Sequence, residues 1–531
     1  MSGEILSTTL DAGYPLGLLF SAEGAPYLAA ANAVGQGFNV YGELGLRSLK
    51  RPLLDRTKAR EIPFEFLGRE FMVPSYILPV VDTRGNYFGG THDSREDFQN
   101  SISSHAEVEV SSGFFSGEMK ASFASELETS SRFAFSFKHF IGQFAYLTFD
   151  PSQGFAALDD DFKARVRALP AQVSQDNLRE FCTFFEDFGG YYTRRVTLGG
   201  SLRFSVSVSQ ESRLRKEDIS AMMKAQYDGL FTKGSLSADV ARSTTWKSYS
   251  ENSRTDIRAV GGDPSTISAL IGVSPLDPNG ATVKAYKDWL DSTKSAPAIS
   301  DFALEGIWTL CGDRRDAVQK AWKMYTQLLH LRLTVRTRTA PVPWTPWPPK
   351  IDPTPPLITL GRSLQPSTPP ASFCGFQMVI LAPERQVNDP LTVRLDKYYN
   401  VEVKTPWRDV YGAMYRQIEA DLRSTARDGD LVVLASFGLD FHMVPPSSLA
   451  GLFQSVGADR KLEEWLEKAK AGYESGGWIS SPTNYALVGF MNRGTGTGIE
   501  ALNWTFRQPG SLSLDTFLYR ESLHGRFTLG V

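Results

Sequence analysis

The sequence predicts an α+β protein in which a mixed N-terminal part is followed by a separate C-terminal domain. Residues 132–149 and 194–208 alternate apolar and polar side chains, as strands do. Residues 160–169 and 174–185 have the apolar spacing of helices. A stretch dense in prolines, from Thr339 to Pro370, then marks a change of composition. Strand-like and helix-like runs alternate again after it, so we expect two domains.

Further elements of the N-terminal part follow the two long strands. Gly261 and Gly262 interrupt a strand, because paired glycines permit a sharp bend. Residues 299–304 form another strand-like run, and Asp313 to Leu331 has the spacing of an amphipathic helix.

The proline-rich stretch predicts the boundary between the domains. Its prolines exclude a helix or a central strand and favour a stiff, extended linker. Beyond it, strand-like runs occupy 377–382, 431–435 and 485–490, and helix-like runs occupy 409–427 and 461–471. The sequence therefore predicts an N-terminal domain over 1–335, a linker over 336–372, and a C-terminal α/β or α+β domain over 373–531.

Composition indicates a well-packed globular protein and argues against nucleic acid as a partner. Hydrophobic residues make up 42% of the chain and charged residues 22%, and the net charge is −3. The three cysteines, Cys182, Cys311 and Cys374, are far apart in the sequence and suggest no disulfide framework or metal site. One pair is conceivable, but buried free thiols are the expectation.

The first residues do not have the pattern of a secretory signal. Met1 to Ile5 lacks a basic region, and the apolar run from Pro15 to Phe20 is short for a leader. No segment reaches the roughly 20 apolar residues of a membrane helix. We expect a protein that is made soluble, is secreted without a recognisable signal peptide, and enters a membrane only by rearranging.

Two segments of the N-terminal domain alternate apolar and charged or polar residues on both sides of a turn. This is the pattern of strands that face lipid on one side and a wet lumen on the other, and each arm can supply the about 9–11 residues of a tilted transmembrane strand. The residues expected to face lipid are Ala106, Val108, Val110, Met119, Ala121 and Phe123 in the first segment and Ala221, Met223, Ala225, Leu236, Ala238 and Val240 in the second. Those expected to line the lumen are Glu109, Glu118, Lys120, Lys224, Asp228 and Asp239.

The turns of these two segments carry apolar residues that are candidates to enter lipid first. They are Phe114 and Phe115 in the first segment and Leu230 and Phe231 in the second. Two hairpins give four strands per protomer, and only a closed barrel satisfies their backbone in lipid, so many protomers must form one ring. The alternatives are amphipathic hairpins on a soluble sheet, charges that merely face solvent, and turn aromatics tucked into the core.

Motifs for catalysis are weak, and we expect neither enzymatic activity nor a cofactor. His92 and Asp93 precede Glu96 and Asp97, but no second histidine lies at ligand spacing. No nucleophile elbow or phosphate-binding loop occurs. The glycines of residues 494–498 lack the spacing of a dinucleotide site and indicate a flexible loop.

One motif carries a resemblance to a known family. Phe181 is followed after six residues by Phe188, Gly189, Gly190, Tyr191 and Tyr192. This resembles the signature of the membrane attack complex/perforin family, which has Tyr or Trp, six residues, and then aromatic-Gly-Thr-His-aromatic. Phe181, Gly190 and Tyr191 depart from that pattern, whereas Phe188, Gly189 and Tyr192 fit it. Gly35–Tyr41 and Ser48–Asp55 also look like the opening of such a domain, and the resemblance covers about residues 30 to 335.

The resemblance implies a central, bent antiparallel sheet flanked by two helical hairpin clusters that later unfurl. Ala, Glu, Lys, Met and Ser are frequent in the two alternating segments, so these could be helical in water. Gly199, Gly200, Gly261 and Gly262 suit hinge positions, although a turn without motion would also need them.

The C-terminal domain has a looser resemblance to the interleukin-like inducer domain of secreted signalling proteins and glycan-processing enzymes. Residues 430–437 and 485–494 carry it. It implies a receptor or glycan reader, and the alternative is a packing module that keeps the pore domain closed.

Taken together, these resemblances imply a pore-forming toxin. It would be a soluble monomer that binds the lipid, glycan or protein receptor of a target cell membrane, forms a homo-oligomeric ring and inserts two hairpins per protomer. It looks similar to bacterial, in part insecticidal, members of the family. The alternative is an adhesion or signalling protein that keeps the fold but never inserts.

Overall fold

The computed structural model divides the chain into two compact units, Met1–Thr326 and Gln327–Val531. Antiparallel sheets and helices make up both units, which confirms the α+β fold class. The structure describes residues 26–92, 95–109, 113–123, 133–209, 212–273, 279–338, 354–360, 362–364, 366, 374–383, 391–401, 410–440, 443–474, 482–504, 510–520, 522–523 and 525–530.

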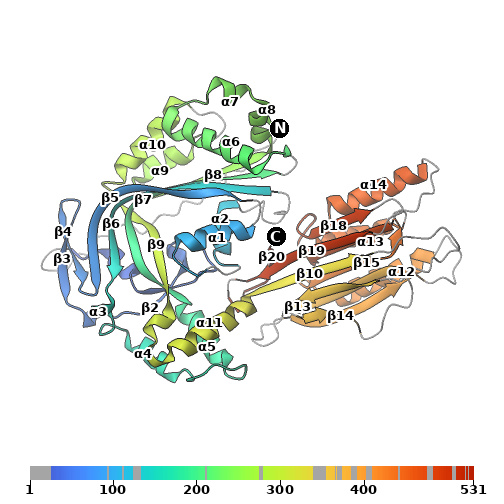
Figure 1. The fold of residues 1–531 in the computed structure, drawn as a ribbon, viewed down its shortest axis with the longest axis horizontal. Coiled ribbons are helices and arrows are strands. Elements are labelled where there is room, and N and C mark those ends of the chain that lie inside the picture. Colours follow the sequence, from blue (N-terminus) through green and yellow to red (C-terminus); the bar gives the residue numbers. More distant parts are fainter. Residues whose placement is uncertain are drawn as a thin grey trace. The chain divides into compact units, whose positions relative to one another are not determined.

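An antiparallel sheet forms the centre of the first unit. Its strands lie in the order β2-β1-β7-β6-β5, and β8 and β9 also pair with β7. The long strands β5, β6 and β7 curve along their length (Figure 1). The strands are β1 Gln36–Phe38, β2 Leu49–Pro52, β5 Ile77–His92, β6 Phe133–Phe149, β7 Tyr191–Ser209, β8 Ser253–Val260 and β9 Ala298–Gly306.

Both faces of the sheet are buried where its middle strands run. In β6, Phe135 and Phe137 lie on one face, whereas Ala134 and Phe140 belong to a core on the other, and all four are buried. Because neighbouring residues of a strand point to opposite faces, such a strand needs apolar residues in both registers. The sequence predicted β6 and β7 as residues 132–149 and 194–208, and the structure confirms both.

Helices of the first unit begin and end at the signals that the sequence carries. Asp159 caps α4 by accepting a hydrogen bond from the Phe162 amide, and α5 ends at Gly189, whose φ is 78°. The structure confirms the predicted helices at 160–169, 174–185 and 313–331 as α4, α5 and α11. The helices are α1 Arg95–His105, α2 Ser116–Phe123, α3 Pro151–Gly154, α4 Asp160–Ala168, α5 Leu178–Phe188, α6 Lys216–Asp228, α7 Ala238–Arg242, α8 Thr244–Asn252, α9 Pro264–Ile271, α10 Gly280–Ser292 and α11 Arg315–Leu329.

Shorter elements complete this unit. The strands β3 and β4 pair in a two-stranded sheet of their own. A single π-helical turn, η6, directly continues α6. These elements are β3 Glu61–Phe66, β4 Arg69–Pro74, η6 Gly229–Lys233 and the 3-10 turns η1 Ala29–Ala33, η2 Leu46–Ser48, η3 Arg56–Lys58, η7 Ile307–Leu310 and η8 Gly312–Arg314.

The second unit consists of two antiparallel sheets and a layer of helices. One sheet has the order β12-β11-β10-β19-β20, and the other has the order β14-β13-β15-β17-β16 with β18 beside β17. Its strands are β10 His330–Arg338, β11 Thr354–Leu360, β12 Arg362–Leu364, β13 Gly375–Pro383, β14 Leu391–Asn400, β15 Leu431–Phe437, β16 Leu439–Asp440, β17 Pro482–Phe490, β18 Ile499–Trp504, β19 Ser511–Tyr519 and β20 Thr528–Gly530.

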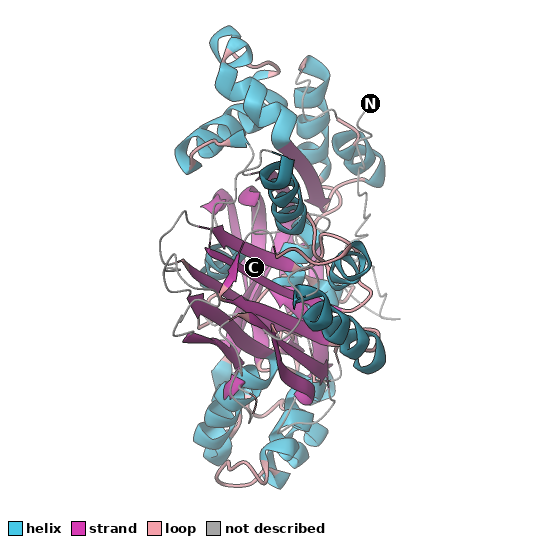
Figure 2. Cartoon of the chain, turned by 90° about the vertical axis from the view of Figure 1, so that its right-hand side faces the viewer, coloured by secondary structure: helices cyan, strands magenta, loops and turns pink. Residues whose placement is uncertain are grey.

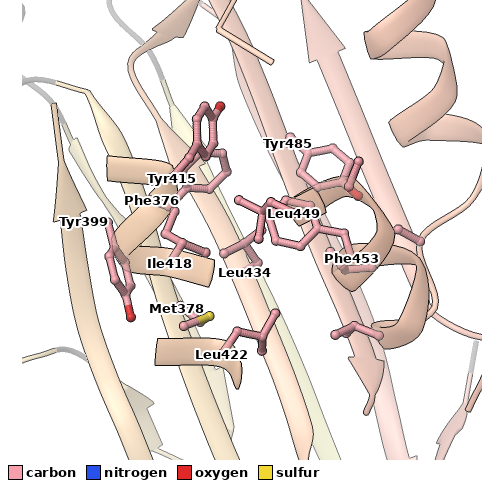
Figure 3. Packing of buried hydrophobic residues seen from close by; sticks show 14 of the residues in the cluster. Phe376, Met378, Tyr399, Tyr415, Ile418, Leu422, Leu434, Leu449, Phe453 and Tyr485 are labelled. Carbon is pink, nitrogen blue, oxygen red and sulfur yellow. The ribbon is translucent and has the colours of Figure 1, made fainter. Parts of the chain in front are cut away.

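Two hydrophobic cores lie on opposite faces of the larger sheet of this unit. Val379, Val433 and Val488 pack against Leu333 and Ile358 of the other sheet. The opposite face packs against the helices in the core that Figure 3 shows, where the rings of Phe376 and Tyr415 lie 6.0 Å apart. These helices, α12 Val410–Thr425, α13 Ser447–Val456 and α14 Arg460–Glu474, lie on one side of the strands (Figure 2).

The predicted domain boundaries need correction at the linker. The first domain was expected to end at residue 335, but β10 pairs with β11 and β19 inside the second unit. The prediction that prolines exclude a central strand from 336–372 is wrong for β11, which lies between β10 and β12. Pro355 and Pro356 fit because they lie at a β-bulge, where the pairing shifts between Arg336 and Arg338. Residues 339–353, 361, 365 and 367–372 of the predicted linker lie outside the described residues.

All three cysteines are free and buried, as the sequence predicted. No helix among the residues that the structure describes is long and apolar enough to cross a membrane.

Candidate functional site: two helical clusters inserted between strands of the central sheet

Two groups of helices connect neighbouring strands of the central sheet. The first cluster, α1 and α2 with residues 106–109 and 113–115, follows β5 in the sequence and precedes β6. The second cluster, α6, η6, α7 and α8, follows β7 and precedes β8. Figure 1 shows them on opposite sides of the sheet, with α1 and α2 on one side and α6 to α10 on the other.

Neighbouring residues of β7 show why the two clusters lie on opposite faces. Arg203 forms an ion pair with Glu118 of α2, in the first cluster. Phe204, the next residue, packs its ring 5.8 Å from that of Tyr227 in the second cluster. Because successive side chains of a strand alternate between faces, each cluster covers its own face.

The structure buries most residues of the first cluster that the sequence assigned to lipid contact. Ala121 is half-buried, and Val110 lies outside the described residues. The buried ones are Ala106, Val108, Phe114, Phe115, Met119 and Phe123. Their role in a membrane stays a prediction.

Phe114, expected at an exposed tip, instead lies in a box of aromatic rings. Its ring centroid is 5.3 Å from that of Tyr41, 6.0 Å from that of Tyr191 and 6.1 Å from that of Trp322. All four side chains are buried. In this state of the protein the turn is therefore tucked into the core, which was the alternative reading of these aromatics.

Hydrogen bonds attach the start of α2 to the segment between β1 and β2. The amide of Phe115 donates to the carbonyl oxygen of Val40 at 2.5 Å, and the amide of Gly117 donates to that of Tyr41 at 2.9 Å. A Cβ at Gly117 would overlap the backbone of Gly42, so only glycine allows this approach. No local sequence pattern reveals this attachment, because the two segments are far apart in the chain.

Glu118, predicted to line a lumen, is instead the acidic partner in a buried ion pair. Its side chain is 2% exposed and pairs with Arg203, which is 10% exposed. The other carboxylate oxygen accepts a hydrogen bond from the Leu44 amide at 2.9 Å. Burial lowers the pKa of Arg203 to about 10, and the nearby Arg258 guanidinium acts in the same direction.

The other lumen candidates of the first cluster are less constrained. Glu109 is 63% exposed, and its carboxylate lies 3.9 Å from the Lys323 ammonium. The side chain of Lys120 lies outside the described residues.

In the second cluster the predicted lipid-facing residues do not share one face. Leu230 and Phe231, the predicted tip, are buried in the π-helical turn. A helix turns 100° per residue, so residues at period two spread around its circumference instead of forming a stripe. Of the residues predicted to face lipid, Met223 is buried, Ala225, Leu236 and Val240 are half-buried, and Ala221 and Ala238 are exposed. Of the residues predicted to line the lumen, Lys224 and Asp239 are exposed and Asp228 is half-buried.

Sequence reasoning missed the helices α9 and α10, which complete the second cluster's packing. Trp289 of α10 is fully buried, and its indole N–H donates to the Gly261 carbonyl at 2.8 Å. Asp263 and Asn279 cap α9 and α10 by accepting hydrogen bonds from backbone amides. Asp263 before Pro264 and Asn279 before Gly280 were helix-start signals that could have revealed both helices.

The residues of the sequence signature join α5 to β7. Phe181 and Phe188 are buried on α5, and Tyr191 and Tyr192 begin β7. The Tyr192 hydroxyl donates to Glu305 at 2.8 Å, and burial raises the pKa of that tyrosine.

Two glycines of the signature allow close packing. A Cβ at Gly189 would overlap the backbone of Phe38, and one at Gly190 would overlap the Trp322 ring. The signature thus forms one wall of the aromatic box around Phe114.

The predicted hinge glycines meet at one level of the sheet. Gly199 and Gly200 of β7 pair with Gln143 and Gly142 of β6 beside a shift in register. Gly261 and Gly262 follow β8 directly, with φ of 76° and 94°. A Cβ at Gly261 would lie 2.6 Å from the carbonyl oxygen of Gly199. These glycines therefore lie where the pairing partner of β7 changes from β8 to β9. A hinge motion at these glycines stays a prediction.

His92 was weighed as a possible metal or acid/base residue together with Asp93, Glu96 and Asp97, but Asp93 and the side chain of Glu96 lie outside the described residues. The His92 ring packs 6.0 Å from that of Phe98 and 5.9 Å from that of Phe137. Within the described ranges, no three His, Cys, Asp or Glu side chains are grouped to hold a metal ion.

The family model of the MAC/Perforin domain matches residues 25–332, more than half of the chain. The chain belongs to the MAC/Perforin family. The match covers both clusters, the signature and the whole central sheet, so these are parts of one MAC/Perforin domain. It confirms the resemblance inferred from residues 181–192.

Individual relatives of this MAC/Perforin protein are distant. Complement component C6 of Bos taurus is 23% identical over 340 residues, which is 61% of this chain and 33% of that protein. The chain thus spans about a third of the length of this curated relative. Among solved structures, GNIP1Aa from Chromobacterium piscinae is 15% identical, with a TM-score of 0.46 over 78% of this chain and 76% of that one. Astrotactin-2, a perforin-like membrane protein involved in neuronal development, is 11% identical, with a TM-score of 0.27 over 54% of this chain and 96% of that one.

Proposed function

We propose that this protein is a pore-forming toxin whose two helical clusters refold into membrane-spanning β-hairpins. It is secreted in soluble form, binds a target cell membrane and assembles with further copies into a ring. The second unit recognises the target surface through lipid, glycan or protein, and no enzymatic step or cofactor takes part. Membership in the MAC/Perforin family and the position of the clusters support the proposal.

The position of the clusters between paired strands is the observation that carries it. The first cluster leaves the sheet where β5 and β6 still pair, at His92 and Phe135. The second leaves it where β7 and β8 pair, at Val208 and Ser253. A cluster that extends as a hairpin therefore continues two existing antiparallel strands without breaking any pairing.

The length of the inserted segments suits this refolding. Each is about 40 residues long, which gives about 20 residues per arm. A tilted transmembrane strand needs only about 9–11 residues, so each arm can cross the bilayer and still reach the sheet. In an extended hairpin, every second residue lies on the same face, so the predicted lipid-facing residues would share one face. In the helices of the described state they do not.

Insertion also requires that buried apolar side chains leave the protein core. Phe114, Phe115, Leu230 and Phe231 are at most 1% exposed in this state. Lipid offers them an apolar environment at little transfer cost, whereas water does not. The clusters should therefore open at a membrane surface.

Dye release from vesicles made of target-cell lipids tests the proposal, with rings sought by negative-stain imaging. A matched pair of variants sharpens the test, because Ala238 and Asp239 are neighbours that are both exposed in this state. Ala238→Lys places a charge on the predicted lipid face, at about 2–4 kcal/mol near the bilayer midplane, and should abolish release. Asp239→Lys points into the lumen and should retain it.

Membrane binding and ring formation without dye release would contradict pore formation. That outcome would favour an adhesion or signalling protein that keeps the fold. Lysis assays on a panel of cells, insect cells among them, then identify the target.

A further inference from the structure

Four side chains on neighbouring strands form one row across the central sheet. Phe88 of β5 pairs with His139 of β6, His139 pairs with Arg203 of β7, and Arg203 pairs with Arg258 of β8. Residues directly opposite one another in antiparallel strands lie on the same face. The row therefore crosses all four strands from which the two clusters depart.

The first cluster rests directly on this row. His105, the last residue of α1, stacks on Phe88 with ring centroids 3.6 Å apart. Glu118 of α2 pairs with Arg203, and Arg258 donates to the carbonyl oxygen of Ala121 in the same helix. Both helices of the cluster thus hold the sheet through members of the row.

Among the three titratable members of the row, His139 is the one without a charged partner of its own in the described ranges. Its side chain is 4% exposed, and its ring lies 4.9 Å from that of Phe88. Its Nδ1 has no hydrogen-bond partner within the part of the chain that the structure describes. Burial lowers the pKa of His139 to about 4, so the ring is neutral at pH 7.

The charges around His139 are already engaged with one another. Arg203 pairs with Glu118, and Arg258 lies 2.9 Å from Asp256 and 4.0 Å from Glu43. Asp301 of β9 accepts a hydrogen bond from the His105 Nε2–H at 3.0 Å. The charge of Asp301 favours the protonation of His139, whereas His105 opposes it. A proton on His139 would add a third cation beside Arg203 and Arg258, whereas the carboxylates named above already pair with other groups.

We propose that this row is a proton-sensitive latch, which holds the first cluster on the sheet while His139 is neutral and releases it when His139 becomes protonated. Release exposes the imidazolium to water and separates it from the two guanidinium groups. For its purpose the latch rests on the proposed pore-forming function, since it would time the opening of the first hairpin in an acidic compartment or at an acidic surface.

The sign and size of the effect follow from linkage. The pKa of His139 is about 4 in the packed state, whereas a histidine exposed to water has a pKa of about 6.5. The neutral ring therefore stabilises the packed state, and this stabilisation is lost as the pH falls from about 6.5 to about 4. With these two values, the ratio of released to packed cluster rises roughly 30-fold between pH 7.5 and pH 5.

Hydrogen exchange on the full-length protein in solution, corrected for the intrinsic effect of pH, tests the latch without any membrane. Peptides from residues 95–105 and 116–123 should lose about 30-fold in protection between pH 7.5 and pH 5, while those from β6 stay protected. His139→Gln should remove this pH dependence. His139→Phe, which keeps a neutral ring beside Phe88, should do the same if the amide is not tolerated.

A second buried histidine provides the matched control. His330 of the second unit also has a pKa lowered by burial to about 4, and its ring stacks on that of Phe517. His330→Gln should leave the acid response of the first cluster unchanged. The latch is refuted if the wild type keeps the protection of α1 and α2 down to pH 5, or if both folded His139 variants open at the wild-type pH.

The result separates the latch from the pore. Opening in acid without dye release contradicts pore formation and leaves the latch intact. Dye release that does not depend on pH, together with constant protection, contradicts the latch and leaves pore formation intact.

Discussion

Replacing Glu118 by glutamine should loosen the first cluster strongly. Glu118 is 2% exposed and Arg203 is 10% exposed, so the pair is shielded from water. The substitution leaves the Arg203 charge buried beside Arg258 without its main partner. Removing one partner of a buried pair costs about 3–5 kcal/mol, because the remaining charge is neither solvated nor paired.

Hydrogen exchange of residues 116–123 measures this loss. A change of 3–5 kcal/mol in the opening free energy corresponds to roughly two to four orders of magnitude in protection. Asp288→Asn is the control, because its partner Lys284 is 75% exposed and Asp288 is 48% exposed, so breaking this pair should cost only about 0.3–0.5 kcal/mol. A double replacement of Glu118 and Arg203 by methionine should recover most of the protection.

If residues 116–123 were as protected in Glu118→Gln as in the Asp288→Asn control, the ion pair would not be what holds α2 on the sheet. The apolar contacts of Met119 and Phe123, both buried, would then account for its packing.

Three further predictions concern other parts of the chain. Phe114→Ala should cost about 3–5 kcal/mol in the stability of the first unit, measured by chemical denaturation, because it empties a ring site in a packed core; a change below 1 kcal/mol would contradict the aromatic box. The piece 327–531 should give a cooperative unfolding transition, whereas 373–531, which lacks β10 to β12 and exposes a core face, should not; equal stability of the two would contradict the corrected boundary. Asp239→Lys should shift the reversal potential of single pores toward anion selectivity, and an unchanged potential would show that residue 239 does not face the lumen.

Part of the central sheet could be predicted from the sequence because apolar side chains recur there with period two. In β7, Leu202, Phe204, Val206 and Val208 alternate with Ser201, Arg203, Ser205 and Ser207, and this pattern predicts a strand instead of a helix. The helix α5 was predicted over residues 174–185, and the structure has it at Leu178–Phe188, where Phe181, Phe184, Phe185 and Phe188 recur at helical spacing.

The state of the two clusters could not be read from alternation alone. Residues 219–227 alternate apolar and polar side chains, yet they form the helix α6. The period-two pattern describes the hairpin that we propose, whereas the helix follows from residue propensity and from packing on the sheet. A sequence that serves two conformations carries the pattern of both.

Residues that depend on distant partners were also out of reach. Glu118 was expected in a lumen because a charge in an alternating segment suggests water. Its buried partner Arg203 comes from a strand far along the chain, and no local pattern reveals such a pair. Likewise Pro355 and Pro356 argued against a strand, because the bulge that accommodates them arises only from pairing with β10.

Refolding of the second cluster into strands with lipid on one face is tested most directly at four label positions. Ser220, Ala221, Ala238 and Asp239 are all exposed to water in the described state, and the three native cysteines are buried, so single cysteines there can be labelled selectively. An environment-sensitive dye on each residue is read before and after pore formation, with a quencher attached to the lipid tails. We predict that dyes at Ala221 and Ala238 become quenched by the lipid-attached quencher, while those at Ser220 and Asp239 stay in water. Equal quenching at all four positions, or at none of them in vesicles that have released their contents, would contradict it.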